Sequence, residues 1–489
     1  MTLLTLLLYI GIAALALTVL VGLTKKGHKS WIMTFLQNFS GVLFIVSGFV
    51  KAIDPMGTAF KMEQYFAEFE YTFADSALSF LAPLFPFLSS ISLIFSILMI
   101  VLEIILGIML LLGHRPKLTS WSFLLLVVFF TILTGFTFLT GYVPGDVNFF
   151  QFASWGPYTP TNMRVTDCGC FGDFIKLEPR ISFYKDLVLL LPAFYFVFRH
   201  KDMHQLFSHR TRNIIIGVST VLLVIFCLKN SVWGLPVVDF RPFKVGTNLY
   251  EKKTAEEEAA ASVQITEWKL QNKATGEIKV LPHQEYMSSL AQYPKEQWTV
   301  VDQIKSKPAI QATKVSEFSV IDHDGYDVAE DILTDSGHVF LIVAYKLKGE
   351  SSTSEVAVPD TLWSVDTIRL DNDSLTVVRS IQSIESRQEV REIFSWDDKY
   401  IRDYVEKINP LMKKALEGGA KVYAMAGGAG TEKLASFSEA IQSPYPWYEA
   451  DDILLKTIIR SNPGVVHLKS GEVLHMWHKN HLPDQLLLE

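Results

Sequence analysis

The chain has 489 residues and a net charge of −7, and 49% of its residues are hydrophobic while only 19% are charged. This composition is too apolar for an ordinary soluble protein, and the chain is too long for a bundle of membrane helices alone. Residues 1–236 carry a net charge of +4 and residues 237–489 carry −11. The sequence therefore predicts a membrane half and a water-exposed half. Neither half is basic enough to indicate nucleic-acid binding.

Six apolar runs in the first half have the length of a membrane-spanning helix, which is roughly 20 residues. They are residues 2–23, 32–53, 85–113, 119–141, 182–198 and 213–234. The first run lacks a positively charged region before it and a small-residue cleavage site before Lys25. We therefore interpret it as a retained helix and not as a signal peptide.

The charges of the connecting segments predict the orientation of these spans. Segments 25–31, 114–118 and 199–212 together hold nine Lys and Arg residues and one acid, Asp202. Segments 54–80 and 142–181 hold four basic and nine acidic residues. Because Lys and Arg are retained on the cytoplasmic side, both termini and the whole C-terminal half are expected outside the cytoplasm. This predicts a multi-pass protein of the bacterial inner membrane with a periplasmic C-terminal domain.

The stretch TDCGCFGD at 166–173 holds Cys168 and Cys170, two of the three cysteines in the chain. An oxidising compartment favours a disulfide between them, and cysteines two residues apart lie within about 7 Å, which a disulfide can bridge. The ring would be small and the bond easily reduced, as in catalytic disulfides. The pattern therefore favours a redox-active pair. A structural or inert loop is one alternative. A copper(I) site is the other, whereas a zinc site would lack ligands.

Two further side chains in the predicted spans are candidates for chemistry. Glu103 is a carboxylate within an apolar span, where an unpaired charge would be costly. It could relay protons or contact a quinone, or it could be a protonated acid that bonds a neighbouring helix. Cys227, late in the sixth span, could resolve a mixed disulfide, although buried lone cysteines more often act as small apolar residues. Lys51 and Asp54 at the end of the second span are explained by snorkelling toward the membrane surface.

The second half divides into two predicted regions. Residues 237–312 read as an exit segment, a charged Ala-rich linker and a small β-rich region. Residues 313–489 alternate strand-like and helix-like runs, which is typical of a layered α/β domain. EFSVID and HVFLIVAYKL are expected to be strands. The run from 398 is expected to be a helix ending at Gly418-Gly419, and a final hairpin is expected to turn at Ser470-Gly471. An insertion rich in Ser, Asp and Thr covers 347–397.

Three motifs in order resemble those of the DoxX/MauE group of redox-associated membrane proteins, over roughly residues 30–200. They are SGFVKAIDPMGTAFKMEQYF at 47–66, Glu103 within ILMIVLEIILGIMLLLG, and DCGCFGD at 167–173. The resemblance implies a small helical bundle and, through MauE, a role in maturing methylamine dehydrogenase, where disulfides form in the periplasm. The first span, the sixth span and the long tail depart from the minimal form of the family.

The order of elements in 313–489 resembles a thioredoxin-like fold of the membrane-anchored periplasmic type. SNPGVVHL places Pro463 where such proteins carry a proline, usually cis, that shapes the substrate-binding edge. This region has no cysteine and therefore lacks the CxxC of thioredoxins, so a docking function is expected of it.

The leading hypothesis is a six-span α-helical membrane bundle with a periplasmic α/β thioredoxin-like domain. Such a protein would transfer thiol–disulfide electrons at Cys168 and Cys170 to assist disulfide formation or the maturation of envelope proteins. Its expected partners are periplasmic client proteins or a redox partner protein, and the lipid bilayer. No metal is expected, and a membrane quinone is the candidate acceptor. The competing hypothesis is a non-enzymatic envelope scaffold in which the CGC loop is structural.

Overall fold

The computed structural model describes residues 2–24, 29–165, 169–369 and 375–486. The chain divides into two compact units. The first is Met1–Thr247 together with Lys456–Gly464, and the second is Asn248–Leu455 together with Val465–Glu489. The first unit thus extends past residue 236 and takes in a short segment from near the C-terminus.

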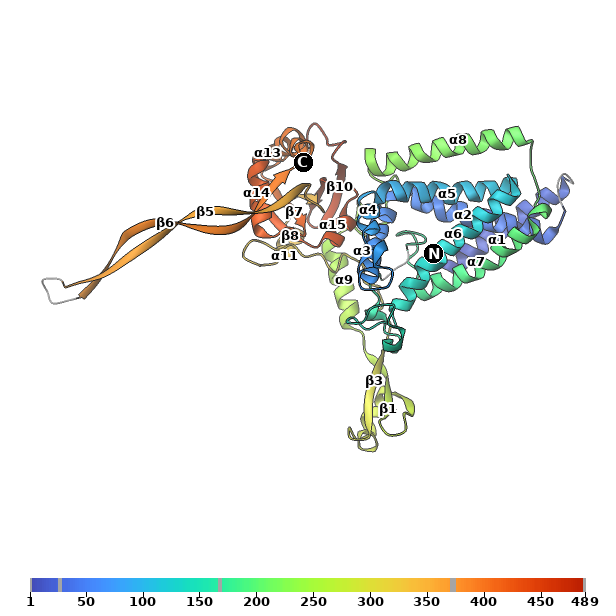
Figure 1. Ribbon diagram of the computed structural model, residues 1–489, viewed down its shortest axis with the longest axis horizontal. Helices are drawn as coiled ribbons and strands as arrows, with labels where there is room; N and C mark the ends of the chain where they lie inside the picture. Colours follow the sequence, from blue (N-terminus) through green and yellow to red (C-terminus); the bar gives the residue numbers. More distant parts are fainter. Residues whose placement is uncertain (1, 25–28, 166–168, 370–374, 487–489) are drawn as a thin grey trace. The chain divides into compact units, whose positions relative to one another are not determined.

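Within the described residues, six helices of the first unit are long and apolar enough to cross a membrane (Figure 1). They are α1 (Leu3–Leu23), α2 (Trp31–Ile53), α5 (Ser92–Leu112), α6 (Pro116–Thr140), α7 (Pro179–Arg199) and α8 (His209–Leu228). Residues Lys229–Trp233 continue α8 as a π-helix. These helices confirm the six runs that hydropathy predicts and show a multi-pass membrane protein.

Two shorter helices occupy the segment between the second and third spans. The predicted third span begins at residue 85, but α5 begins at Ser92 because α4 (Leu84–Ser90) ends in a break at Ile91. The acidic segment 54–80 contains α3 (Pro55–Ala74), which begins with a proline at its first turn and with Asp54 accepting a hydrogen bond from the Gly57 backbone N–H at 2.9 Å. Both features are favourable helix starts.

Two glycines bring the backbones of α2 and α5 close together. A Cβ atom built on Gly41 would lie 2.9 Å from the carbonyl oxygen of Gly107, and one built on Gly107 would lie 2.7 Å from that of Gly41. Small residues allow membrane helices to approach closely and to gain van der Waals contact. The α2–α5 pair therefore forms a tightly packed centre of the bundle, and two of the three sequence motifs lie on it.

The described residues of the second unit form three sheets. A three-stranded sheet of order β2-β1-β3 lies in the part of the chain that was expected to be rich in β-structure, and its strands are β1 (Ile265–Asn272), β2 (Ile278–Pro282) and β3 (Trp298–Lys305). A five-stranded sheet has the order β10-β9-β4-β7-β8. Its strands are β4 (His338–Ala344), β7 (Lys421–Gly427), β8 (Trp447–Ala450), β9 (Gly464–Lys469) and β10 (Glu472–His478).

In the sequence, the first helix of the second half precedes the first strand, and the other helices lie between strands. They are α9 (Leu249–Ala261), α10 (His283–Ser288), α11 (Ala329–Thr334), α12 (Asp398–Arg402), α13 (Asn409–Glu417), α14 (Thr431–Ala440) and α15 (Asp452–Ile458). Strands β4, β7 and β8 run parallel, as connections through helices require. The strand β4 is buried over nearly its whole length, which agrees with its continuous apolar sequence.

Several predictions for this region are confirmed. The helical stretch from 398 ends at Gly418, and Ser470 and Gly471 both have positive φ, as a two-residue hairpin turn requires. The Asn462–Pro463 bond is cis. The prediction of a strand at EFSVID is wrong, because the described structure has only isolated bridges at Ile321 in this stretch. The strand β8 was not predicted. The thioredoxin-like classification stays a prediction.

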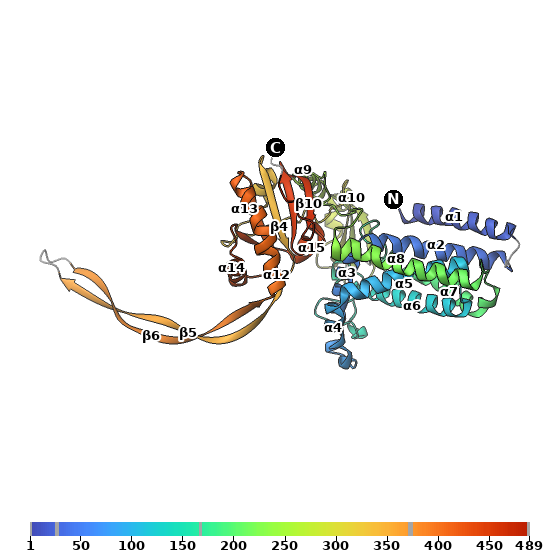
Figure 2. The ribbon, with the colours of Figure 1, turned by 90° about the horizontal axis from the view of Figure 1, so that it is seen from above.

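The insertion at 347–397 is a long antiparallel ribbon of two strands, β5 (Gly349–Arg369) and β6 (Leu375–Trp396) (Figure 2). Among the described strands, these two pair with each other and with no third strand. Sequence analysis identified 347–397 as an insertion rich in Ser, Asp and Thr and assigned it no secondary structure; in the ribbon, successive residues alternate between the two faces.

Candidate functional site

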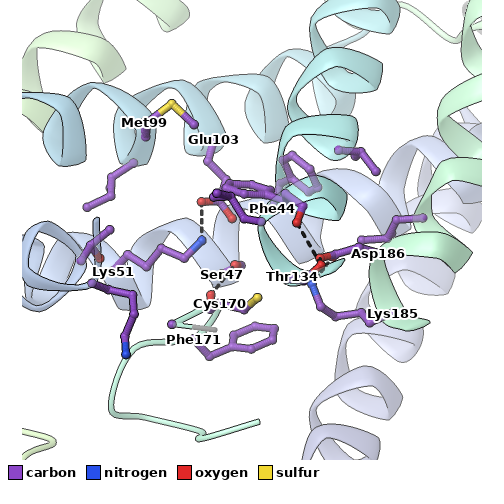
Figure 3. Close-up of a pocket in the computed structure, with 18 of the residues that line it drawn as sticks. Phe44, Ser47, Lys51, Met99, Glu103, Thr134, Cys170, Phe171, Lys185 and Asp186 are labelled. Carbon is purple, nitrogen blue, oxygen red and sulfur yellow. Dashed lines mark hydrogen bonds and ion pairs between the residues drawn. The ribbon is translucent and has the colours of Figure 1, made fainter. Parts of the chain in front are cut away.

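The three sequence motifs meet at the end of the bundle where α2 ends and α7 begins (Figure 3). The first motif contacts the third through Ser47, whose hydroxyl donates a hydrogen bond of 3.1 Å to the backbone carbonyl of Cys170. The first motif contacts the second through Lys51 and Glu103, whose charged atoms lie 2.7 Å apart. Residues far apart in the chain are thus joined around one cysteine.

The ion pair between Lys51 and Glu103 is buried. The two side chains are 8% and 4% exposed, and the Lys51 ammonium also lies 5.0 Å from the ring centroid of Phe130. Lys51 therefore does not snorkel to the membrane surface, contrary to the sequence interpretation, because a carboxylate on the neighbouring helix is within reach. A charge in this environment is stable only when it is paired, and each partner here satisfies the other.

A second buried ionic group lies on α7. Lys185 donates to the Asp186 carboxylate at 2.5 Å, and the Thr134 hydroxyl of α6 donates to the other Asp186 oxygen at 3.0 Å. Sequence analysis placed these residues in the fifth span without assigning them a function. Their signal was available, because two adjacent charges within an apolar run are expected to face the interior of a bundle.

The CGC loop turns sharply just beyond the cysteines. Gly169 and Gly172 have φ values of 61° and 52°, a conformation that favours glycine. The Gly172 N–H donates to the Gly169 carbonyl, and Phe171 is almost fully buried. The turn therefore anchors Cys170 against the bundle. Cys168, and with it the predicted Cys168–Cys170 disulfide, lies outside the described residues.

Cys170 is a partly exposed residue that lines a cavity together with apolar side chains and two ion pairs. Its desolvation raises the pKa of the thiol, and the nearby ammonium groups of Lys185 and Lys51 offset this only in part. Because the thiolate is the reactive form, a raised pKa makes Cys170 a slow attacking thiol at neutral pH.

Arg460 joins the first and third motifs from a distant part of the chain. Its guanidinium contacts the Asp54 carboxylate at 2.8 Å and the Asp173 carboxylate at 3.2 Å, and its side chain is only 5% exposed. Burial raises the pKa of Asp54, but the positive charge and hydrogen bonds of Arg460 outweigh it, so the pKa lies below its usual value. The last residue of the DCGCFGD motif is thereby held to the end of α2. Sequence analysis missed Arg460.

The remaining predicted site residues lie apart from this ionic network. Cys227 is fully buried in α8 within the main apolar cluster of the bundle, and the structure shows no disulfide between it and Cys170. This setting fits a small apolar side chain. Pro463 belongs to the segment Lys456–Gly464, which also carries Arg460. Its carbonyl accepts a hydrogen bond from the Ser461 hydroxyl at 2.6 Å.

A small cavity lies between the ionic groups and the CGC loop (Figure 3). Ser47, Lys51, Glu103, Cys170 and Lys185 line it together with apolar side chains of α2, α3, α5, α6 and α7. Its volume of about 50 Å³ holds a few water molecules. A few water molecules contain fewer heavy atoms than a bare quinone ring does. The cavity can hold and transfer protons at a buried thiol, but as it stands it does not fit the quinone that the sequence suggested.

Comparison with known families adds one match. Residues 29–144 match the family model described as "Methylamine utilisation protein MauE". No curated protein and no solved structure matches the chain. The matched part contains Lys51, Asp54 and Glu103 and ends before the CGC loop. The six apolar helices show a multi-pass membrane protein, which is similar to MauE over residues 29–144.

Proposed function

We propose that the membrane unit carries out thiol–disulfide exchange at Cys168 and Cys170 and thereby assists disulfide formation or the maturation of envelope proteins. The observation that supports this most is the convergence of the three motifs around Cys170. The Ser47 hydroxyl donates a hydrogen bond to the Cys170 carbonyl, and the Lys51–Glu103 and Lys185–Asp186 pairs line the same small cavity. The match to a protein of methylamine utilisation is consistent with a maturation role, because its match covers two of these motifs.

The proposed reaction begins with a Cys168–Cys170 disulfide and a client protein with two thiols. A client thiolate attacks the Cys168 sulfur, the bond between the enzyme sulfurs breaks, and Cys170 leaves as a thiolate. The nearby Lys185 ammonium stabilises this charge. The raised pKa of Cys170 then favours its protonation, which slows the reverse attack. A second client thiolate displaces Cys168 and forms the client disulfide. Two electrons and two protons have then moved from the client to the pair.

Return to the disulfide requires an acceptor of two electrons. Because the cavity does not fit a quinone, we assign this role to a disulfide of a redox partner protein, which would be reduced by the same exchange in reverse. The C-terminal domain has no cysteine, so it cannot carry the electrons itself. We propose that the C-terminal domain binds client or partner proteins, and that the segment around Pro463, which belongs to the first unit, is a further contact for them.

A second candidate function is a scaffold with a structural loop. The double contact of Arg460 with Asp54 and Asp173 favours it, because such a buried ionic link stabilises a fixed loop whether or not the cysteines react. Trapping of the redox partner protein distinguishes the two functions.

Single cysteine variants test the exchange reaction. Cys170→Ala cannot form the starting disulfide, but its Cys168 thiolate can still attack the disulfide of the redox partner protein, with one partner sulfur leaving as a thiolate. The resulting mixed disulfide should accumulate, because Cys170 is no longer present to displace the partner from Cys168. Cys168→Ala should give far fewer adducts, since the remaining Cys170 thiol is poorly ionised. Alkylation in intact cells before lysis, followed by non-reducing electrophoresis, would show the adducts as bands of higher mass that reductant removes. Cys227→Ala is the matched control and should behave as wild type. If neither single variant traps a protein, the scaffold function is favoured.

The proposed periplasmic location of the CGC loop and the C-terminal domain rests on the charges of the connecting segments. An alkaline phosphatase fusion after Glu489 should therefore be active, and one near His204 should be inactive. Fusions to a reporter that folds only in the cytoplasm should give the reverse pattern. An active fusion at His204 with an inactive one at Glu489 would place the CGC loop in a reducing compartment and contradict the proposed reaction.

A further inference from the structure

A wide groove lies at the end of the bundle opposite the CGC loop, where α2 and α6 begin and α7 ends. Its volume is about 840 Å³, and four of the nine residues that line it are cations: Lys29, Arg115, Lys117 and Lys201. They come from three separate parts of the chain, just before α2, at the start of α6 and just after α7. The fold therefore gathers into one groove charges that are far apart in the sequence.

The cations of this groove are not balanced by acids. No acidic residue lines the groove. The acid next to it in the chain, Asp202, is paired with Arg199 at 2.6 Å. Within the part of the chain that the structure describes, none of the four cations has a carboxylate partner, and Lys29 donates to the backbone carbonyl of Lys201 at 2.6 Å. Because like charges held close together repel one another, the groove favours an anionic ligand.

The groove also has an apolar side. Leu118 and Trp121 follow Lys117 in the first turns of α6, line the groove, and are 51% and 48% exposed. Indole rings of membrane proteins gather at the boundary between the lipid head groups and the hydrocarbon. The groove thus places cations at the ends of the spans and apolar side chains just inside them. A ligand that matches both parts carries an anionic group and a hydrocarbon chain.

We propose that this groove binds an anionic phospholipid, with its phosphate among the four cations and an acyl chain along Leu118 and Trp121. Basic pockets at the ends of membrane helices suit anionic head groups, and the charge of each Lys or Arg adds to the attraction. The guanidinium of Arg115 can donate two parallel hydrogen bonds to a phosphate, while the lysines act as point charges. The positive end of the α6 dipole contributes in addition. This site lies in the membrane unit but takes no part in the proposed thiol reaction.

Lipid titration of the full chain in detergent, followed by native mass spectrometry, tests the proposal. Phosphatidylglycerol is expected to form one-to-one adducts at lower concentrations than phosphatidylcholine with the same acyl chains. Arg115→Gln should raise the dissociation constant of phosphatidylglycerol roughly fivefold, because one basic contact is lost. Arg210→Gln is the matched control, since it removes the same charge near the start of α8 but lines no part of the groove, and it should leave the dissociation constant unchanged. Equal binding of the two lipids, or equal effects of the two variants, would overturn the proposal.

Inorganic phosphate distinguishes a lipid from a soluble anion as the ligand. It offers the same charge to the cations but makes no contact with the apolar side of the groove. Phosphate at millimolar concentration, with the ionic strength held constant by chloride, should therefore leave the phosphatidylglycerol adduct in place. Loss of the adduct under these conditions would show that the groove takes a free anion and would contradict the assignment to a lipid.

Photolabelling makes the test independent of any folding defect in the Arg115 variant. Phosphatidylglycerol with a photoreactive group near the start of one acyl chain is incorporated into vesicles that contain the wild-type chain. It should label the peptide that holds Leu118 and Trp121. Excess phosphatidylglycerol without the reactive group should remove this label, whereas the same excess of phosphatidylcholine should not. A label that both lipids remove equally would indicate ordinary lipid contact around the bundle, and the proposal would then be wrong.

Discussion

Replacement of Lys51 by methionine is expected to destabilise the membrane unit by about 3–5 kcal/mol, the usual effect of removing one partner of a buried ion pair. The remaining Glu103 carboxylate would be 4% exposed in an apolar bundle without its cation. In the variant this side chain would be either a charged group without a partner or a neutral acid, and both states are less favourable than the native ion pair. The stability would be measured as loss of folded protein on heating in detergent, followed by size-exclusion chromatography.

The double variant Lys51→Met with Glu103→Leu decides whether the pair acts as a unit. Replacement of both partners by apolar residues of similar size is often nearly neutral, so the double variant should recover most of the lost stability. Lys61→Met is the matched control, because Lys61 also lines the cavity but is only partly buried and bonds Gln64 at 2.8 Å. A single Lys51 variant as stable as wild type, or a double variant as unstable as the single one, would contradict the importance of the pair.

Replacement of Arg460 by methionine is expected to weaken the pH-dependent stability that Asp54 contributes. In the native protein the pKa of Asp54 lies below its usual value of about 3.9. Its contribution to stability is therefore complete above that usual value and is lost as the pH falls through the lowered pKa. Without Arg460, the Arg241 charge and the Gly57 backbone N–H still lower the pKa of Asp54 against its burial, but the largest lowering influence is lost and the pKa rises relative to wild type. The stability that Asp54 contributes above its usual pKa is then reduced.

The Arg460→Met variant should therefore differ from wild type most at neutral pH and least at pH values below the lowered pKa of Asp54, where this carboxyl is protonated in both proteins. The difference in unfolding temperature between the two proteins, measured at several pH values in detergent, isolates this effect from titrating groups that Arg460 does not contact. At neutral pH a loss of about 3–5 kcal/mol is expected, as for Lys51. Lys456→Met is the control, because the Lys456–Glu63 contact of 3.5 Å is partly exposed. A difference that does not change with pH would show that Arg460 acts by packing and not through its charge.

Local sequence predicted the parts of the membrane unit that depend on local chemistry. Hydropathy located all six helices, because a span must be apolar over its whole length whatever it packs against. The partner of Glu103 could also have been predicted. Lys51 lies in a neighbouring span, and two opposite charges in apolar helices are expected to pair. The snorkelling interpretation missed this because it considered α2 alone.

Contacts between distant residues could not be read from the sequence. Arg460 is separated from Asp54 by some four hundred residues, and nothing in its own surroundings indicates two carboxylate partners. The ribbon was missed for a different reason. Its Ser, Thr and Asp residues marked the segment only as an insertion, although the apolar Trp363 and Val365 on either side of Ser364 carried the period-two signal of a strand.

The close contact of Gly41 with Gly107 has a mechanical consequence for the distant ion pair. The two glycines set the distance between α2 and α5 at this point, because a methyl group on either would push against the opposite backbone. Lys51 lies ten residues along α2 from this point, which corresponds to about 15 Å of helix. A small increase in the angle between the two helices at this contact would produce a larger displacement of Lys51. The strength of the buried pair, and with it the polarity around Cys170, can therefore be tuned by a single side chain that lines no part of the cavity.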